Sequence, residues 1–178
     1  MTRRAEAADL AAVNAMHGRC SPQTLFGRYQ TGRFALRAHE WARLTRQGTS
    51  WVTSPVYRPD VVVAVTHLLP HGTEGRGELA LLVEDGWQDV GLGTALARWA
   101  VSRAPLFGVR RAVVVTTRDN HRMTAICDAL GAHVEPAGAP GGTRDGTEDG
   151  DDVLHFVLAV PEGTTPRCVH GTCGHASA

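Results

Sequence analysis

The sequence lacks an excess of either charge. Its 178 residues contain 18 lysine plus arginine residues and 18 aspartate plus glutamate residues, so the formal net charge is zero. A dedicated nucleic-acid-binding domain usually carries a basic excess, and we therefore expect no nucleic-acid partner. The chain also lacks an apolar run near the ~20 residues that span a bilayer, and no apolar segment follows the arginines near its N-terminus, as a signal peptide would require. We expect a cytoplasmic protein with no membrane partner.

Cysteine is scarce as well, with four residues in the chain. Cys20 and Cys127 are isolated, and we expect both to be reduced thiols. The stretch "CVHGTCGH" near the C-terminus holds side chains of the types that zinc accepts, namely Cys168, His170, Cys173 and His175. Ligands so close together strain a tetrahedral site, and the stretch has no C-x-x-C pair. We expect a flexible tail and no metal; a metal-binding tail that gates the domain is the alternative.

Length and composition indicate one globular domain, because 43% of the residues are hydrophobic and 20% are charged. We expect this domain to span residues 1–160. Residues 136–152 are rich in glycine, proline and aspartate and predict a flexible loop. Residues 161–178 predict a disordered tail. Nothing in the sequence indicates the oligomeric state.

Hydrophobic periodicity predicts a mixed α/β domain. Ser21 and Pro22 are a typical N-cap and first residue for a short helix. The other predicted helices cover 7–18, 33–48, 91–104 and 120–131; the predicted strands are two within 50–70, then 77–84, 110–117 and 151–160. The apolar run at 110–117 is typical of a strand covered on both faces.

Gly91 and Gly93 stand between a predicted strand and a predicted helix. The first N–H groups of a helix have no partner within it, and the helix dipole adds a partial positive charge. Glycines there let a phosphate approach those groups. No Gly-Lys-Ser/Thr follows, as a P-loop requires, and Leu96 stands where a dinucleotide motif has its third glycine. The alternative is a helix start that uses small residues for close packing.

The wider pattern resembles the GNAT superfamily, the CoA-dependent N-acetyltransferases. Gln88, Gly91 and Gly93 form Q-x-x-G-x-G directly after an apolar strand, and Asn120 opens a later helix that closes with "ALGA". The resemblance implies the GNAT fold, an α/β (α+β) architecture with a mixed sheet of about six or seven strands and about four helices. In that fold two neighbouring strands splay apart and form the acetyl-CoA cleft. Only residues 2–5 are available for the family's first strand, so we expect it to be truncated or absent.

The resemblance also implies which residues bind acetyl-CoA as co-substrate. The strand edge at Leu81, Leu82 and Val83 would pair with the pantetheine arm, and Asn120 would hydrogen-bond it. The diphosphate would rest on main-chain N–H groups of Gln88, Asp89, Val90, Gly91, Leu92, Gly93 and Thr94. Family members often carry a glycine and a basic residue where this chain has Asp89 and Val90. A lost charge-assisted contact is worth ~1.5–3 kcal/mol, so we expect binding to persist but to be weaker.

The reaction implied by the resemblance is direct attack of a neutral amine on the acetyl carbonyl. An amine such as lysine, with a pKa near 10.4, needs a base. Glu78 is the first candidate, against the equal alternative that it is a solvent-facing strand residue. Glu84 is second and His67 third, because a lone strand histidine is more often structural. The main-chain N–H of Val83 is the candidate donor to the developing oxyanion.

Cys127 stands where many relatives have a tyrosine that serves as the acid for the leaving CoA thiolate, seven residues after Asn120. It is either a thiol acid or, as we expect, a small core residue of an amphipathic helix. The missing tyrosine, with Met123 three residues after Asn120, resembles family branches that acetylate protein lysines. The predicted acceptor is therefore a primary amine, with a protein lysine as one candidate. The alternatives are a small-molecule amine acetyltransferase and an acyl-CoA-binding regulatory module without catalysis.

Overall fold

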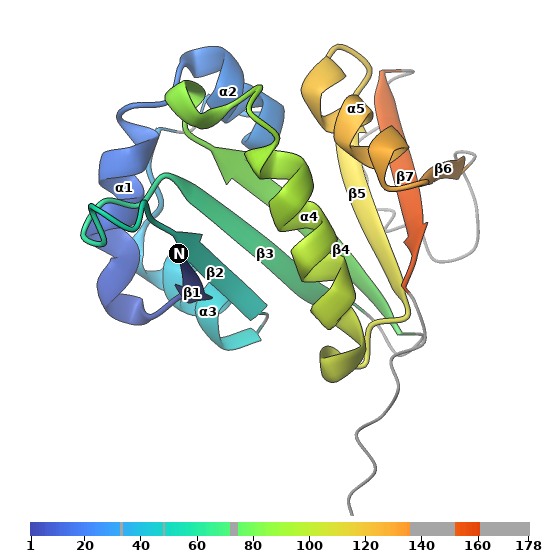
Figure 1. Cartoon of the computed structure of the whole chain (residues 1–178), viewed down its shortest axis with the longest axis horizontal. Coiled ribbons are helices and arrows are strands. Elements are labelled where there is room, and N and C mark those ends of the chain that lie inside the picture. The colour runs from blue at the N-terminus through green and yellow to red at the C-terminus, as the bar shows by residue number, and fades with distance from the viewer. Residues whose placement is uncertain (33, 48, 72–74, 136–151, 161–178) are drawn as a thin grey trace, which may run out of the picture.

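The computed structural model describes residues 1–32, 34–47, 49–71, 75–135 and 152–160. Within them the chain forms a seven-stranded mixed sheet with helices on both faces (Figure 1). The strands are β1 (Thr2–Arg4), β2 (Thr49–Thr53), β3 (Ala64–His71), β4 (Arg76–Val83), β5 (Arg111–Thr117), β6 (His133–Glu135) and β7 (Val153–Ala159). The α-helices are α1 (Leu10–His17), α2 (Pro22–Tyr29), α3 (Ala38–Gln47), α4 (Leu92–Arg103) and α5 (His121–Ala129). Short 3-10 turns cover Ala7–Asp9, Asp85–Trp87 and Ala104–Phe107.

Among the strands that the structure describes, β4 and β5 form the one parallel pair. The strand order is β1-β2-β3-β4-β5-β7-β6, and the other neighbouring pairs are antiparallel. The pairing of β4 with β5 covers only Arg76–Glu78 against Arg111–Val113. Both strands then continue without pairing to each other, and Figure 1 shows β5 leaning away from β4 beyond this point. The predicted splayed pair is therefore confirmed.

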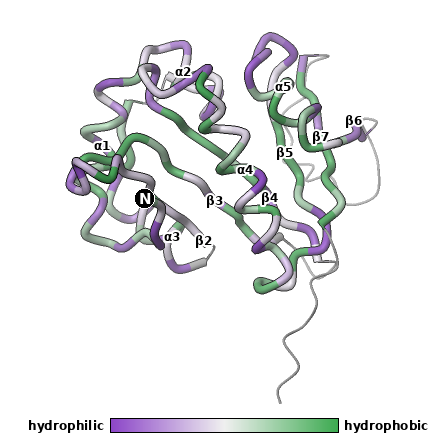
Figure 2. Tube along the Cα trace, viewed as in Figure 1, coloured by the Kyte–Doolittle hydropathy of each residue, from purple (hydrophilic) through white to green (hydrophobic). Residues whose placement is uncertain are grey.

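Among the described residues, two hydrophobic clusters lie on opposite faces of the sheet, and the strands β4, β5 and β7 are largely apolar (Figure 2). Side chains of α1, α2 and α3 pack on one face, which we call the α1–α3 face. Side chains of α4 and α5 pack on the other, the α4–α5 face. The first cluster includes Val13, Met16, Trp41, Val65 and Leu82; the second includes Leu79, Leu81, Leu96, Val114 and Cys127. Because side chains alternate along a strand, Glu78 and Ala80 share the α1–α3 face with Leu82.

The first strand is truncated and not absent, since β1 has three residues and pairs with β2 from Thr2 to Arg4. Two other expectations about elements change. The helix expected at 33–48 begins only at Ala38, because the side chain of Asn14 bonds both main-chain groups of Leu36 and holds the chain extended there. β5 is not covered on both faces, because Val115 is 41% exposed.

The short strand β6 was not predicted from the sequence. It has three residues and pairs with β7 through His133, Val134 and Glu135. A segment this short has too few residues to establish a periodic pattern. The predicted loop at 136–152, except for Asp152, and the predicted tail at 161–178 lie outside the described residues.

Candidate functional site

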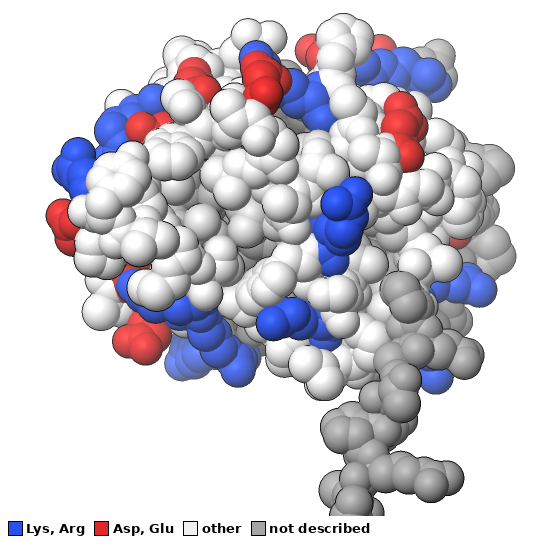
Figure 3. All heavy atoms as spheres, viewed as in Figure 1, with Lys and Arg blue, Asp and Glu red and all other residues white. Residues whose placement is uncertain are grey.

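A cavity of about 870 Å³ opens where β4 and β5 separate. It is lined by α2, by β4 and β5, by the loop that leads into α4 and by the start of α5. The volume lies within the range of small-molecule sites, ~300–1,000 Å³. On the face shown in Figure 3, charged residues of both signs are interspersed and do not gather into one patch. The cavity is therefore the strongest candidate for a binding site among the described residues.

Alternate residues of β4 direct their main-chain groups toward this cavity. The N–H of Glu84 donates to the carbonyl of Val63 at 2.9 Å, so even-numbered β4 residues bond to β3. Leu82 therefore uses its main chain in the pairing with Val65. Leu81 and Val83 direct theirs to the opposite edge, the side on which β5 leaves the sheet. Of the three predicted edge residues, Leu81 and Val83 thus offer main-chain groups to the cavity and Leu82 does not.

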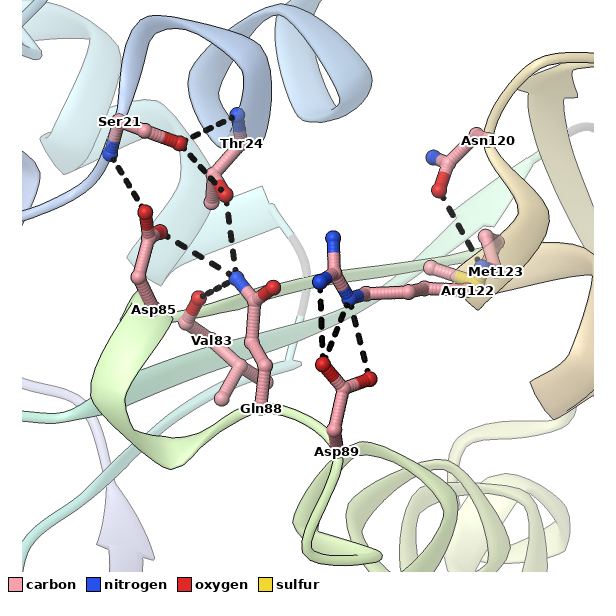
Figure 4. Close-up of polar contacts among 9 residues, drawn as sticks. All are labelled: Ser21, Thr24, Val83, Asp85, Gln88, Asp89, Asn120, Arg122 and Met123. Carbon is pink, nitrogen blue, oxygen red and sulfur yellow. Dashed lines mark hydrogen bonds and ion pairs between the residues drawn. The ribbon is translucent and has the colours of Figure 1, made fainter.

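Gln88 ties the loop before α4 to the end of β4 and to α2 (Figure 4). Its Nε2 donates to the carbonyl of Val83 at 2.8 Å and to the hydroxyl of Thr24 at 3.1 Å. Its main-chain N–H donates to the carbonyl of Asp85. The predicted row of free main-chain donors therefore starts after Gln88, whose side chain instead satisfies the last carbonyl of β4.

Asp85 joins the same network from the other side. Its Oδ2 accepts from the N–H of Ser21 at 3.1 Å, and Ser21 is the N-cap of α2, accepting from the N–H of Thr24. Burial alone would raise the pKa of the Asp85 carboxyl, but hydrogen bonds from Thr24 and Ser21 outweigh it and lower that pKa. The start of α2 is thereby fixed beside the loop that begins α4.

The two motif glycines have different local reasons. Gly91 is the N-cap of α4 with a φ of 82°, which is left-handed, and a side chain added there would meet no atom within 4 Å. Gly93 lies within α4, and a Cβ there would lie 2.9 Å from Cδ1 of Ile126 on α5. Gly91 thus meets a conformational need and Gly93 a close helix contact. The close-packing alternative applies to Gly93, and the role of both in diphosphate binding stays a prediction.

These reasons predict different costs for alanine at the two positions. Gly91→Ala should lower the free energy of unfolding by ~1–2 kcal/mol, because an L-residue is strained in the left-handed region. Gly93→Ala should cost less, because the end of the Ile126 side chain can turn away. Urea denaturation of both variants measures the difference. Equal losses would contradict the assignment, and calorimetry with acetyl-CoA on the same proteins shows whether either methyl group weakens binding.

Asp89 is paired with Arg122, a residue that the sequence analysis did not single out. Oδ2 of Asp89 lies 3.0 Å from Nη2 of Arg122, and the pair links the loop before α4 to the first turn of α5 (Figure 4). Asp89 has a φ of 60°, a conformation that aspartate tolerates better than most residues. The hydrogen bond from Arg122 lowers the pKa of Asp89. The negative charge expected to oppose a diphosphate is thus matched by a neighbouring cation.

The neighbouring motif residue, Val90, is 70% exposed.

Asn120 lies at the junction of α2 and α5. Its Oδ1 caps α5 by accepting from the N–H of Met123 at 3.2 Å, and its Nδ2 donates to the carbonyl of Gly27 at 3.3 Å. A Cβ on Gly27 would lie 3.2 Å from this Nδ2, so the glycine permits the contact. Asn120 also lines the cavity. Its predicted bond to pantetheine would be made by an amide that already has two protein partners.

The structure separates the three candidate bases. Glu78 lines the cavity at the last residue pair of β4 with β5. Glu84 accepts from Nη2 of Arg19 at 2.8 Å and lies outside the lining. His67 is 2% exposed beneath α3, donates Nδ1–H to Ser50 and does not line the cavity. Glu78 is therefore the one of the three that lines the cavity.

Cys127 belongs to the core on the α4–α5 face. Its side chain is fully buried, and burial raises its pKa to about 12, with a contribution from Asp128. The thiol is also absent from the cavity lining. The core interpretation is therefore supported and the acid interpretation is not.

Among the described residues, no group of three or more His, Cys, Asp or Glu side chains is arranged to hold a metal ion. No helix in the same part of the chain has the length and apolar character needed to cross a membrane. The four candidate metal ligands of the tail lie outside this part.

Comparison with known proteins gives one family and one fold. The model of the acetyltransferase (GNAT) family matches residues 13–132. No curated protein matches the chain. The GNAT domain of S. lividans PAT is similar at 17% identity over 89% of each chain, with a TM-score of 0.74. Salmonella typhimurium yncA, solved with its cofactor acetyl-CoA, is similar at 19% identity over 94% of this chain and 98% of its own, with a TM-score of 0.67.

A third similar structure is the ribosomal-protein-S18-alanine N-acetyltransferase from Escherichia coli, at 18% identity over 90% of this chain and 93% of its own, with a TM-score of 0.62. These identities are low, so the likenesses establish the fold and leave the acceptor open. The family model covers more than half of the chain and includes the cavity's glycine loop and Asn120. The chain therefore belongs to the acetyltransferase (GNAT) family, whose members are acetyl-CoA-dependent N-acetyltransferases.

Proposed function

We propose that this acetyltransferase moves the acetyl group of acetyl-CoA directly to a primary amine inside the cavity between β4 and β5. The observation that carries the proposal is the position of Glu78, where β4 and β5 part, together with the main chain of Val83 facing the same cavity. One carboxylate and one free N–H are the two groups that direct attack on a thioester needs. The location of the protein in the cytoplasm stays a prediction.

The residues around the cavity fit acetyl-CoA. When bound, it supplies an acetyl group activated as a thioester. Leu81, together with the carbonyl oxygen of Val83, which can accept a second hydrogen bond beside that from Gln88, offers the main-chain edge to which an extended pantetheine arm can pair as a strand does. The first N–H groups of α4, on Leu92, Gly93 and Thr94, have no partner within the helix and suit a diphosphate. We assign the cofactor site to these residues together with Asp89, Val90, Gly91 and Asn120, while Gln88 supports the loop and Leu82 lines the cavity.

Glu78 and Val83 divide the chemical work. The carboxylate of Glu78 takes the proton from the incoming amine, directly or through a water. The N–H of Val83 donates to the carbonyl oxygen as negative charge develops there. No hydrogen bond or ion pair is found for the Glu78 carboxylate among the described residues, so none of them competes for it.

Release of free thiol from acetyl-CoA in the presence of an amine panel tests the proposal. The panel contains lysine peptides, free N-terminal peptides, polyamines and amino acids. The chain itself contains no lysine, so labelled acetyl groups on lysine can come only from an added acceptor. Calorimetric binding of acetyl-CoA without thiol release from any amine would favour a regulatory module instead. No binding at millimolar acetyl-CoA would overturn the proposal.

A further inference from the structure

Arg28 places an uncompensated positive charge at the cavity. It lies on α2 with Leu25 on the same side of the helix, and its side chain is half-buried. Its Nε is buried from solvent and has no hydrogen-bond partner among the described residues. Its guanidinium stacks over the ring of Tyr29 at 5.0 Å, and no ion pair is found for it in that part of the chain. A buried guanidinium N–H is costly unless an acceptor satisfies it.

Glu78 lines the same cavity with the opposite charge. Its side chain shares the α1–α3 face of the sheet with Ala80, which pairs with His67 of β3. Arg28 contributes to the lowered pKa of His67, after the larger effect of burial, so its charge lies near this part of the sheet. Arg28 and Glu78 nevertheless form no ion pair with each other. The cavity therefore presents a cation and an anion that have no ion-pair or hydrogen-bond partner among the described residues.

We propose that the acceptor is a small amino-carboxylate whose carboxylate binds Arg28 while its amine faces Glu78. The inference rests on the proposed function and names the substrate class for it. A zwitterion of this kind satisfies both side chains at once, and the planar guanidinium suits a carboxylate. A lysine side chain on a protein has no carboxylate beside its ε-amine to neutralise the charge of Arg28.

Matched acceptors test this proposal. The twenty L-amino acids, their carboxamides and the corresponding decarboxylated amines are compared as acceptors by thiol release. Binding of the same compounds to the protein saturated with CoA is measured by calorimetry. We expect amino acids to exceed their carboxamides by ~10- to 100-fold in kcat/KM, since a hydrogen bond to a charged group is lost in the amide.

Arg28→Met should remove this preference, mainly by raising KM for the amino acids. Arg28→Lys should restore part of it. Arg43→Met, at an exposed position of α3, is the matched control and should keep the preference. Arg28→Met removes a buried donor that has no hydrogen-bond partner, so it should not unfold the protein. The melting temperatures of the Arg28 variants and of Arg43→Met check this.

The outcomes separate this proposal from the proposed function. Carboxylate-dependent turnover or binding that is lost in Arg28→Met supports the inference. Equal use of amides, a preference that survives in Arg28→Met, or no binding of any amino-carboxylate overturns it. If the wild-type protein acetylates amines without a carboxylate as well as it acetylates amino acids, the proposed transferase function stands and the amino-carboxylate as acceptor is rejected. Absence of acetylation overturns the proposed function, and calorimetry still decides whether Arg28 binds the carboxylate.

Discussion

Replacing Glu78 by glutamine should lower kcat for acetyl transfer by ~10²- to 10⁴-fold, the usual contribution of a general base. The variant keeps the size of the side chain and loses the group that accepts a proton. Because Glu78 lies where β4 and β5 separate and not on the glycine loop, acetyl-CoA affinity should stay within about twofold. Steady-state kinetics with the best acceptor, together with calorimetry for acetyl-CoA, measure both quantities.

The pH profile distinguishes loss of a base from a general loss of structure. Below the pKa of the acceptor amine, the fraction of free amine rises about tenfold per pH unit. The rate of Glu78→Gln should therefore climb with pH and approach that of the wild type when the amine deprotonates without help. A variant with a general structural defect would stay slower than the wild type at every pH.

Glu84→Gln is the control for this experiment. Glu84 follows the same strand but is paired with Arg19 and does not line the cavity. Its substitution should leave kcat within about twofold, with a small effect on stability because the pair is partly exposed. A wild-type rate for Glu78→Gln, or an equal loss for Glu84→Gln, would remove Glu78 from the mechanism.

Local sequence signals predicted the part of the site that depends on the main chain. The apolar strand, Gln88 and the two glycines identified the loop before α4, and the structure places that loop at the cavity. The separation of β4 and β5 was also predicted, because the resemblance to the family implied a splayed strand pair. The alternation within β4, which leaves Leu81 but not Leu82 with main-chain groups directed at the cavity, depends on the register with β3. Register is a tertiary property that one strand's sequence does not contain.

Side-chain partners across the site were beyond the sequence. Arg122 and Asp89 are far apart in the chain and meet only because α5 begins beside the loop of α4. Arg28 is spaced three residues from Leu25, which places it on the inward side of α2. Spacing alone does not reveal whether an acidic side chain lies close enough to pair with it. An arginine in that position is ordinarily paired. Only the fold shows that its Nε is left without a partner among the described residues.

His67 should make the protein acid-sensitive well above the pH at which carboxylates titrate. Its imidazole is buried beneath Trp41, which it meets edge-on at 6.2 Å between ring centroids. Nδ1–H donates to the Ser50 hydroxyl at 2.8 Å, and that hydroxyl donates to the carbonyl of Leu44, which fixes the neutral tautomer. Burial first, then the charges of Arg28 and His17, lowers the pKa of His67 to about 3.

This lowered pKa sets both the direction and the size of the effect. The unfolded chain binds a proton on this histidine below its ordinary pKa near 6.5, and the folded chain does not until about pH 3. Since the unfolded state holds more protons in this window, stability falls as the pH falls through it. The loss of stability approaches ~1.4 kcal/mol per pH unit below the ordinary pKa, which gives about 1.6 kcal/mol between pH 6.5 and pH 5.

Urea denaturation from pH 7 to pH 4 measures this slope, and two observations isolate His67 from other groups. His67→Gln should reduce the dependence of the unfolding free energy on pH by the contribution of one proton, ~1.4 kcal/mol per pH unit. His39→Gln, on the exposed side of α3, is the control and should not reduce it in this way. In the folded wild type, the imidazole signals of His67 should show no titration by NMR between pH 8 and about pH 4. Titration near its ordinary pKa would mean that water or an anion reaches the ring. The interpretation of His67 as a buried neutral histidine would then be wrong.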